Sequence, residues 1–126
     1  MYRKLITFIS PVFFITLLFA SCMQNTNQVK VTEIRLLQDE KWWGGAVVDG
    51  HNSPYSDINF TYDQNGDCKG NQAQPFFLSS KGRYIWSEKP LKISFSADRI
   101  SIQSFGADII SGKSGETLKD AFLYCS

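Results

Sequence analysis

The stretch PFFLSSKGRYIW, residues 75–86, decides the fold class of this chain. Two runs rich in aromatic and apolar residues, PFFL at 75–78 and RYIW at 83–86, are separated by SSKG. Gly82 ends that connection and can adopt the positive φ that a tight reversal requires. The pattern predicts two antiparallel strands joined as a hairpin.

The segment that follows repeats the two-residue period of β-strands. In KISFSADRISI, Ile93, Phe95 and Ala97 alternate with serines, and Ile100 and Ile102 resume the alternation after a short turn. Because alternate residues of a strand point to opposite faces, these five residues are predicted to face one core. This segment is therefore a second predicted hairpin.

Other short β-rich segments complete the pattern. VKVTEIRLL at 29–37 alternates, but its phase slips, which a β-bulge or a strand bend would absorb. Phe60 and Tyr62 form another short strand, and Asn65-Gly66 is a turn signal. Many short strands separated by turns predict a mainly β fold, an antiparallel β-sandwich over residues 29–112. Most of the aromatic residues in these segments are expected in its core: Phe60, Phe76, Phe77, Tyr84 and Phe95.

The last segment, residues 113–126, has helical rather than strand spacing. Leu118, Ala121, Phe122 and Cys125 recur at i, i+3, i+4 and i+7, which predicts one apolar helix face, and Ser114 is the expected N-cap. The apolar face continues up to the end of the predicted helix. We therefore expect this short helix to be a linker that leads to a further domain.

The first residues have the pattern of an export signal. Arg3 and Lys4 precede the apolar run LITFISPVFFITLLFA, and small residues precede Cys22, so residues 1–21 are predicted to be a signal helix that is removed. The sequence LFASC resembles a bacterial lipobox, which implies a diacylglycerol on Cys22; an uncleaved anchor or a plain secretion signal are the alternatives. Residues 22–28 then form a polar tether. The expected location is the bacterial cell envelope, lipid-anchored in the outer membrane and facing the periplasm.

Charge and cysteine content narrow the choice of partners. The chain has 13 basic and 12 acidic residues, and losing Arg3 and Lys4 with the signal leaves it near neutral, so nucleic acid is not an expected partner. Cys68 and Cys125 remain, and whether they pair is open. With one histidine in the chain and no ligand spacing, we expect no metal and no other cofactor.

Three motifs occur in an order that resembles a known family. They are KWWGGAVVDG at 41–50, NQAQPFFLSSKGRYIWSEKPLKISF at 71–95 and SGETLKDAF at 114–122. Together they resemble the N-terminal portion of bacterial glycoside hydrolase family 31 enzymes, particularly a Bacteroidetes-type group of secreted α-glycosidases. The resemblance implies a galactose-mutarotase-like β-sandwich that precedes a catalytic barrel. Because no barrel is contained in this sequence, no catalytic residue is transferred to it, and whether the protein is an enzyme stays open.

The first of these motifs holds the candidate sugar-binding residues. One of the adjacent Trp42 and Trp43 is expected in the core and the other outside, where an indole offers a flat apolar surface to a sugar ring. The resemblance implies that this indole, with Asp49 and His51, walls the innermost sugar subsite. The alternative is that both indoles are buried, one in the sandwich and one against the missing barrel.

Three functions follow from these expectations. The first is the front section of a secreted glycoside hydrolase of carbohydrate metabolism, which binds an α-linked glycoside but needs a separate barrel for the chemistry. The second is a stand-alone carbohydrate-binding lipoprotein, and the third is a structural lipoprotein without affinity for sugars.

Overall fold

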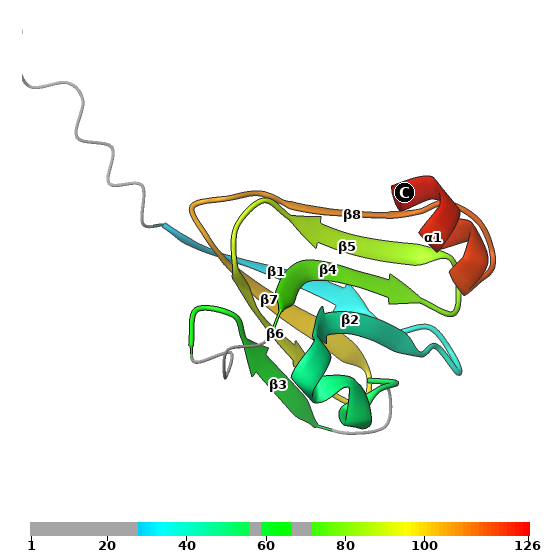
Figure 1. Cartoon of the computed structure of the whole chain (residues 1–126), viewed down its shortest axis with the longest axis horizontal. Coiled ribbons are helices and arrows are strands. Elements are labelled where there is room, and N and C mark those ends of the chain that lie inside the picture. The colour runs from blue at the N-terminus through cyan, green and yellow to red at the C-terminus, as the bar shows by residue number, and fades with distance from the viewer. Residues whose placement is uncertain (1–27, 56–58, 67–71) are drawn as a thin grey trace, which may run out of the picture.

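The computed structural model describes residues 28–55, 59–66 and 72–126, which form two four-stranded antiparallel sheets (Figure 1). The first sheet has the order β1-β7-β6-β3 and the second the order β2-β4-β5-β8. The strands are β1 (Val29–Arg35), β2 (Trp42–Ala46), β3 (Phe60–Asp63), β4 (Ala73–Ser79), β5 (Arg83–Ser87), β6 (Leu91–Phe95), β7 (Arg99–Phe105) and β8 (Ile109–Lys113). A 3₁₀ helix, η2 (Val47–Asn52), follows β2, and the helix α1 (Leu118–Cys125) follows β8. The predicted antiparallel β-sandwich is confirmed.

Both predicted hairpins are present. Strands β4 and β5 pair with Phe77 opposite Ile85, and β6 and β7 pair with Phe95 opposite Ile100. Gly82 has φ +72° in the first connection, as its place before RYIW predicts. The Ser79 hydroxyl oxygen accepts hydrogen bonds from the backbone N–H groups of Lys81 and Arg83, each at 3.1 Å, which fixes the turn.

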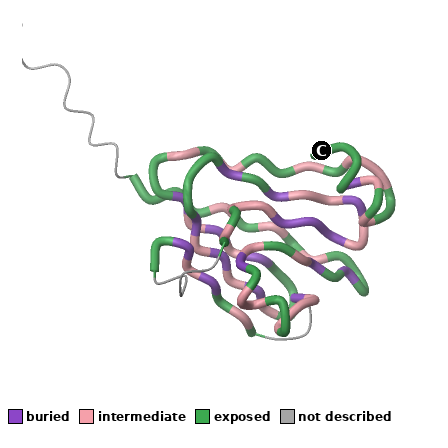
Figure 2. Tube along the Cα trace, viewed as in Figure 1, coloured by how far each residue is buried: buried purple, intermediate pink, exposed green. Residues whose placement is uncertain are grey.

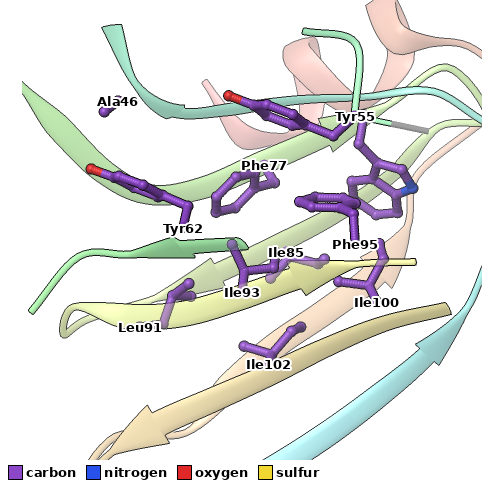
Figure 3. Close-up of a cluster of buried hydrophobic side chains, with 11 residues drawn as sticks. Ala46, Tyr55, Tyr62, Phe77, Ile85, Leu91, Ile93, Phe95, Ile100 and Ile102 are labelled. Atoms are coloured by element: carbon purple, nitrogen blue, oxygen red, sulfur yellow. The ribbon is translucent and has the colours of Figure 1, made fainter. Parts of the chain in front are cut away.

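The core lies between the two sheets and is largely aromatic at its centre (Figure 3). Tyr55 stacks on Phe60 with ring centroids 4.7 Å apart and lies 5.1 Å from the ring of Phe95. The isoleucines of β5, β6 and β7 fill the space beside these rings: Ile85, Ile93, Ile100 and Ile102. Figure 2 shows where buried residues occur along the strands, and in β6 and β7 they alternate with residues of intermediate burial.

Two local predictions are corrected. Strand β1 pairs with β7 in unbroken register, so the phase slip is absorbed by exposing Val29 and Val31 and not by a bulge. The register shift occurs instead in β2, between Gly44 and Gly45. Ala97 is exposed because β6 ends at Phe95, before the alternation can place Ala97 in the core.

Helix α1 begins at Leu118, and Lys113 still belongs to β8. Its N-cap is Thr117 and not the predicted Ser114: Thr117 and Asp120 form a capping box. Ser114 is engaged elsewhere, because its hydroxyl donates to the Gly82 carbonyl oxygen at 3.3 Å, as its backbone N–H does at 2.9 Å. Of the predicted apolar face only Ala121 is fully buried.

Several predictions concern residues outside the described ranges. They are the signal helix over residues 1–21, the lipidated Cys22, most of the tether and the possible disulfide partner Cys68; Cys125 is exposed at the end of α1. Within the described residues, no helix has the length and apolar character needed to cross a membrane.

Replacement of Gly82 tests the importance of the β4–β5 turn. Gly82→Ala should lower the free energy of unfolding by about 2 kcal/mol, since the left-handed backbone is retained and the added Cβ would lie 2.3 Å from the Gly115 carbonyl oxygen. Gly50→Ala is the control, because open space surrounds the added Cβ there. Urea denaturation of both variants measures the difference. Equal midpoints would show that the turn does not need glycine.

Candidate functional site

The two adjacent tryptophans lie on opposite faces of β2, as the strand alternation predicts. Trp42 has an exposed fraction of 0% and belongs to the core between the sheets. Trp43 is half-buried and faces outward. Gly44 has φ +138° and its added Cβ would meet the Phe76 carbonyl oxygen at 2.2 Å, so only glycine allows β2 to approach β4 this closely. Of the two adjacent tryptophans, Trp43 is therefore the one at the surface.

Trp42 lies beside a buried ion pair. The guanidinium carbon of Arg83 is 5.4 Å from the Trp42 ring centroid, a cation–π contact. Arg83 donates through Nε to Glu40 Oε1 at 2.8 Å and through Nη2 to Glu40 Oε2, and Glu40 is buried. The backbone N–H of Leu37 also donates to Glu40 Oε2, at 3.0 Å.

These contacts determine the charge state of Glu40. Burial by itself would raise the pKa of Glu40, but the hydrogen bonds from Arg83 and from the Leu37 N–H outweigh it and hold the pKa below its usual value. The contacts of this carboxylate close the turn after β1, through the Leu37 N–H, and join it to Ser79 of β4 and Arg83 of β5. Glu40 and Arg83 are thus structural residues, and sequence reasoning gave no indication that they pair.

Asp49 and His51 lie in η2 and do not join Trp43. His51 is exposed, and its Nδ1 is 3.0 Å from the Val48 carbonyl oxygen. Asp49 is partly buried, and its backbone carbonyl lies 3.5 Å from the Tyr55 hydroxyl. The hollow that Trp43 lines contains neither residue. The structure therefore does not bring the predicted sugar-binding residues into one site.

The second sheet instead presents an aromatic outer face. Phe76 of β4 pairs with Trp86 of β5, which pairs with Ile110 of β8, and all three side chains point away from the core. Of the aromatic residues predicted in the core, Phe77, Phe95 and Phe60 are there, whereas Phe76 and Tyr84 lie on this outer face. The correction follows from the alternation itself: Phe77 and Ile85 point inward, so their neighbours cannot.

A groove of about 750 Å³ follows this outer face. We call it the aromatic groove; its lining includes Gln74, Phe76, Tyr84, Trp86, Glu88 and Tyr124. The signal that could have found it is present in PFFL and RYIW, where consecutive apolar residues show that both faces of the strands are apolar.

Helix α1 forms one wall of the aromatic groove. It packs against β4 and β5 at the end where these strands connect (Figure 1). Tyr124 of α1 stacks on Tyr84 with ring centroids 5.4 Å apart and planes inclined by 29°. The hydrogen bond from the Tyr124 phenol raises the pKa of Tyr84, so Tyr84 stays neutral at physiological pH. Beneath this pair the Tyr84 ring covers Gly112, where a Cβ would lie 2.6 Å from the Tyr84 hydroxyl.

A second hollow of about 470 Å³ lies between α1 and β2. Its lining is almost entirely apolar and includes Trp43, Phe76, Leu78, Leu118 and Phe122. Phe76 lines both hollows, so α1 lies across an apolar face that is wider than the helix. In the described part of the chain, no three His, Cys, Asp or Glu side chains gather as metal ligands would.

The fold and its aromatic face define a small two-sheet β-sandwich with one partly covered outer surface. Compared with known proteins, the chain matches no family, and no curated protein is significantly similar to it.

The buried ion pair predicts a pH dependence of stability. Because the pKa of Glu40 is lowered in the folded state from a usual value of 4.5, the folded protein binds fewer protons than the unfolded one near that pH. The stabilisation is complete above pH 4.5 and is lost as the pH falls through the folded pKa. Glu40→Gln should lower the free energy of unfolding at pH 7 by about 3 kcal/mol, and this loss should shrink in acid.

Glu33→Gln is the matched control for this pH dependence. Glu33 forms a surface pair with Arg99, at 3.3 Å, and its replacement should cost less than about 1 kcal/mol. Urea denaturation of both variants between pH 3 and pH 7 makes the comparison. A Glu40→Gln loss that is the same at both ends of that range would contradict the assigned role.

Proposed function

We propose that this chain is a non-catalytic carbohydrate-recognition module held at the bacterial cell envelope by a lipid on Cys22. The observation that carries the proposal is the aromatic groove, where Trp86, Tyr84 and Tyr124 come from two different elements and line one open surface. Indole and phenol rings suit the C–H face of a pyranose, while their edges and nearby polar groups accept or donate hydrogen bonds.

The dimensions and lining of the groove support a small ligand. Its volume of about 750 Å³ lies in the range of ligand pockets, which runs from about 300 to 1,000 Å³. Gln74 and Glu88 add an amide and a carboxylate beside the aromatic floor. A few polar groups at an apolar surface are what orients a sugar, because sugars have apolar ring faces and hydroxyl-bearing edges.

We further propose that the module is the front section of a secreted α-glycosidase, as the resemblance to glycoside hydrolase family 31 implies. Support comes from α1, where Phe122, Leu123 and Tyr124 are 57%, 62% and 67% exposed. Three consecutive large apolar residues exposed on one helix favour a neighbour that covers them. In this reading the barrel performs the hydrolysis, and the sandwich only binds and positions the glycoside.

A stand-alone role is the second candidate. The described residues that line the aromatic groove all come from this chain, from β4, β5, β8, α1 or the turn after β5. A sugar-binding lipoprotein therefore needs no second domain to form its site. A purely structural lipoprotein is the third possibility, and the absence of any sugar binding would favour it.

Substitutions in the aromatic groove test carbohydrate binding. Trp86→Ala should weaken binding of α-linked gluco- or galacto-oligosaccharides at least about tenfold, since it removes the central stacking surface. Phe105→Ala is a matched control, because Phe105 is 36% exposed against 37% for Trp86 but lies on the first sheet. A glycan array followed by calorimetry provides the measurement.

The same assay separates the aromatic groove from the loop that holds Asp49 and His51. Trp43→Ala, Asp49→Ala and His51→Ala should leave affinity within about threefold, because these residues do not line the groove. Loss of binding in the Asp49 and His51 variants, with Trp86→Ala unaffected, would move the site to η2.

Lipid attachment is tested separately. Cells that express the full chain in the presence of a radiolabelled fatty acid should label the native protein, whereas Cys22→Ala should stay unlabelled, because the thioether forms on that sulfur. Cys125→Ala is the control for labelling at another thiol. Equal labelling of the native and Cys22→Ala chains would rule out the anchor.

A further inference from the structure

We propose that the aromatic groove selects sugar rings without negative charge, and that Glu88 is the residue that imposes this selection. The inference rests on the proposed carbohydrate binding and names the class of sugar that the groove accepts. It follows from the order of polar and apolar groups along the groove and from the charges that line it.

The groove changes from aromatic to polar along its length. Tyr84 with Tyr124 forms one end, and Phe76 with Trp86 forms the middle. Further along the same face come Gln74 on β4 and Glu88 just after β5. Alternate residues of a strand are about 7 Å apart, which is comparable to the size of one sugar ring. A ring stacked on Trp86 would thus place its hydroxyl edge near the Gln74 amide and the Glu88 carboxylate.

Glu88 is available for a ligand. Among the described residues its carboxylate has no ion-pair or hydrogen-bond partner, and the residue is exposed. An ionised carboxylate only accepts hydrogen bonds, so it can hold sugar hydroxyls or an ammonium group but repels another carboxylate or a sulfate. Gln74 offers both an acceptor and a donor beside it.

In the part of the chain that the structure describes, the lining carries no cation that would offset this charge. Among the described residues that line the aromatic groove, Glu88 is the one that carries a charge, and Lys119 lines the other hollow instead. A carboxylate on the bound ring, about 5 Å from Glu88, would weaken binding by a factor of about four even with the dielectric screening of water. A positive charge at the same position would strengthen it by a similar factor.

Matched ligands isolate the effect of charge. The probes are methyl α-D-glucopyranoside, its 2-amino-2-deoxy analogue and methyl α-D-glucopyranosiduronate, together with the corresponding galactose series. Each is titrated into the full chain in a detergent without a sugar headgroup, and binding is followed by NMR chemical shifts. The expected order of affinity at low salt is amino sugar, then neutral sugar, then uronate.

Two variants identify the responsible side chain. Glu88→Gln should abolish the preference, with the uronate gaining at least about fourfold relative to the neutral sugar. Glu33→Gln changes the net charge equally but lies on the first sheet, paired with Arg99, and should leave the order unchanged. The preference of the native protein should also diminish as salt is raised, because exposed charges are screened.

The outcomes distinguish this inference from the proposed function. If the native protein binds the neutral sugar but the uronate equally well or better, the assignment to Glu88 is wrong while carbohydrate recognition stands. The same holds if Glu88→Gln and Glu33→Gln behave alike. If no sugar of either series binds, carbohydrate recognition and this inference both fail.

Discussion

Strands β4 and β5 carry apolar side chains on both faces, and the opposite sheet can cover only one of them. Phe77 and Ile85 point inward and meet the first sheet, whereas Phe76 and Trp86 point outward. Antiparallel sandwiches usually place polar residues on the outer face. Here the outer face needs a second covering element, and α1 supplies it only in part.

The connection between β4 and β5 also determines where that covering helix lies. The Gly82 carbonyl accepts from the backbone N–H of Ser114 at 2.9 Å, which holds the chain as it leaves β8. Gly82 lies so close to Gly115 that no side chain fits between them. One turn therefore closes the central hairpin and directs the chain toward α1, and Tyr124 is placed over Tyr84 as a consequence.

Period-two patterns predicted the strands well, because each strand needs only its own residues to show them. The hairpins over 75–86 and 92–102 and the opposite orientation of Trp42 and Trp43 were predicted in this way. The sequence contained less information about which residues contact one another across different elements. Which tryptophan enters the core depends on the position of β2 beside β4, and the Glu40–Arg83 pair joins residues 43 positions apart in sequence.

The candidate site was predicted less well than the fold, for a physical reason. The family resemblance placed Asp49 and His51 with a tryptophan, but η2 and the register shift between Gly44 and Gly45 separate them. The aromatic groove instead joins side chains from β4, β5 and α1, which no local pattern connects. The N-cap of α1 shows the same contrast. The spacing of Thr117 and Asp120 fits a capping box, but Ser114 is also a suitable N-cap residue by type. Only the fold shows that Ser114 contacts Gly82 instead.

One wall of the aromatic groove is a helix that would be only marginally stable in isolation. Helix α1 has eight residues, and isolated helices shorter than about 12 residues are marginal in water. Its stability comes from the capping box at Thr117 and from the burial of Ala121 against the second sheet. Tyr124 is in the last turn, farthest from the cap, where helices fray first. A ligand stacked beside Tyr84 and Tyr124 would bury apolar surface on that last turn, so binding and ordering of the helix end would stabilise each other.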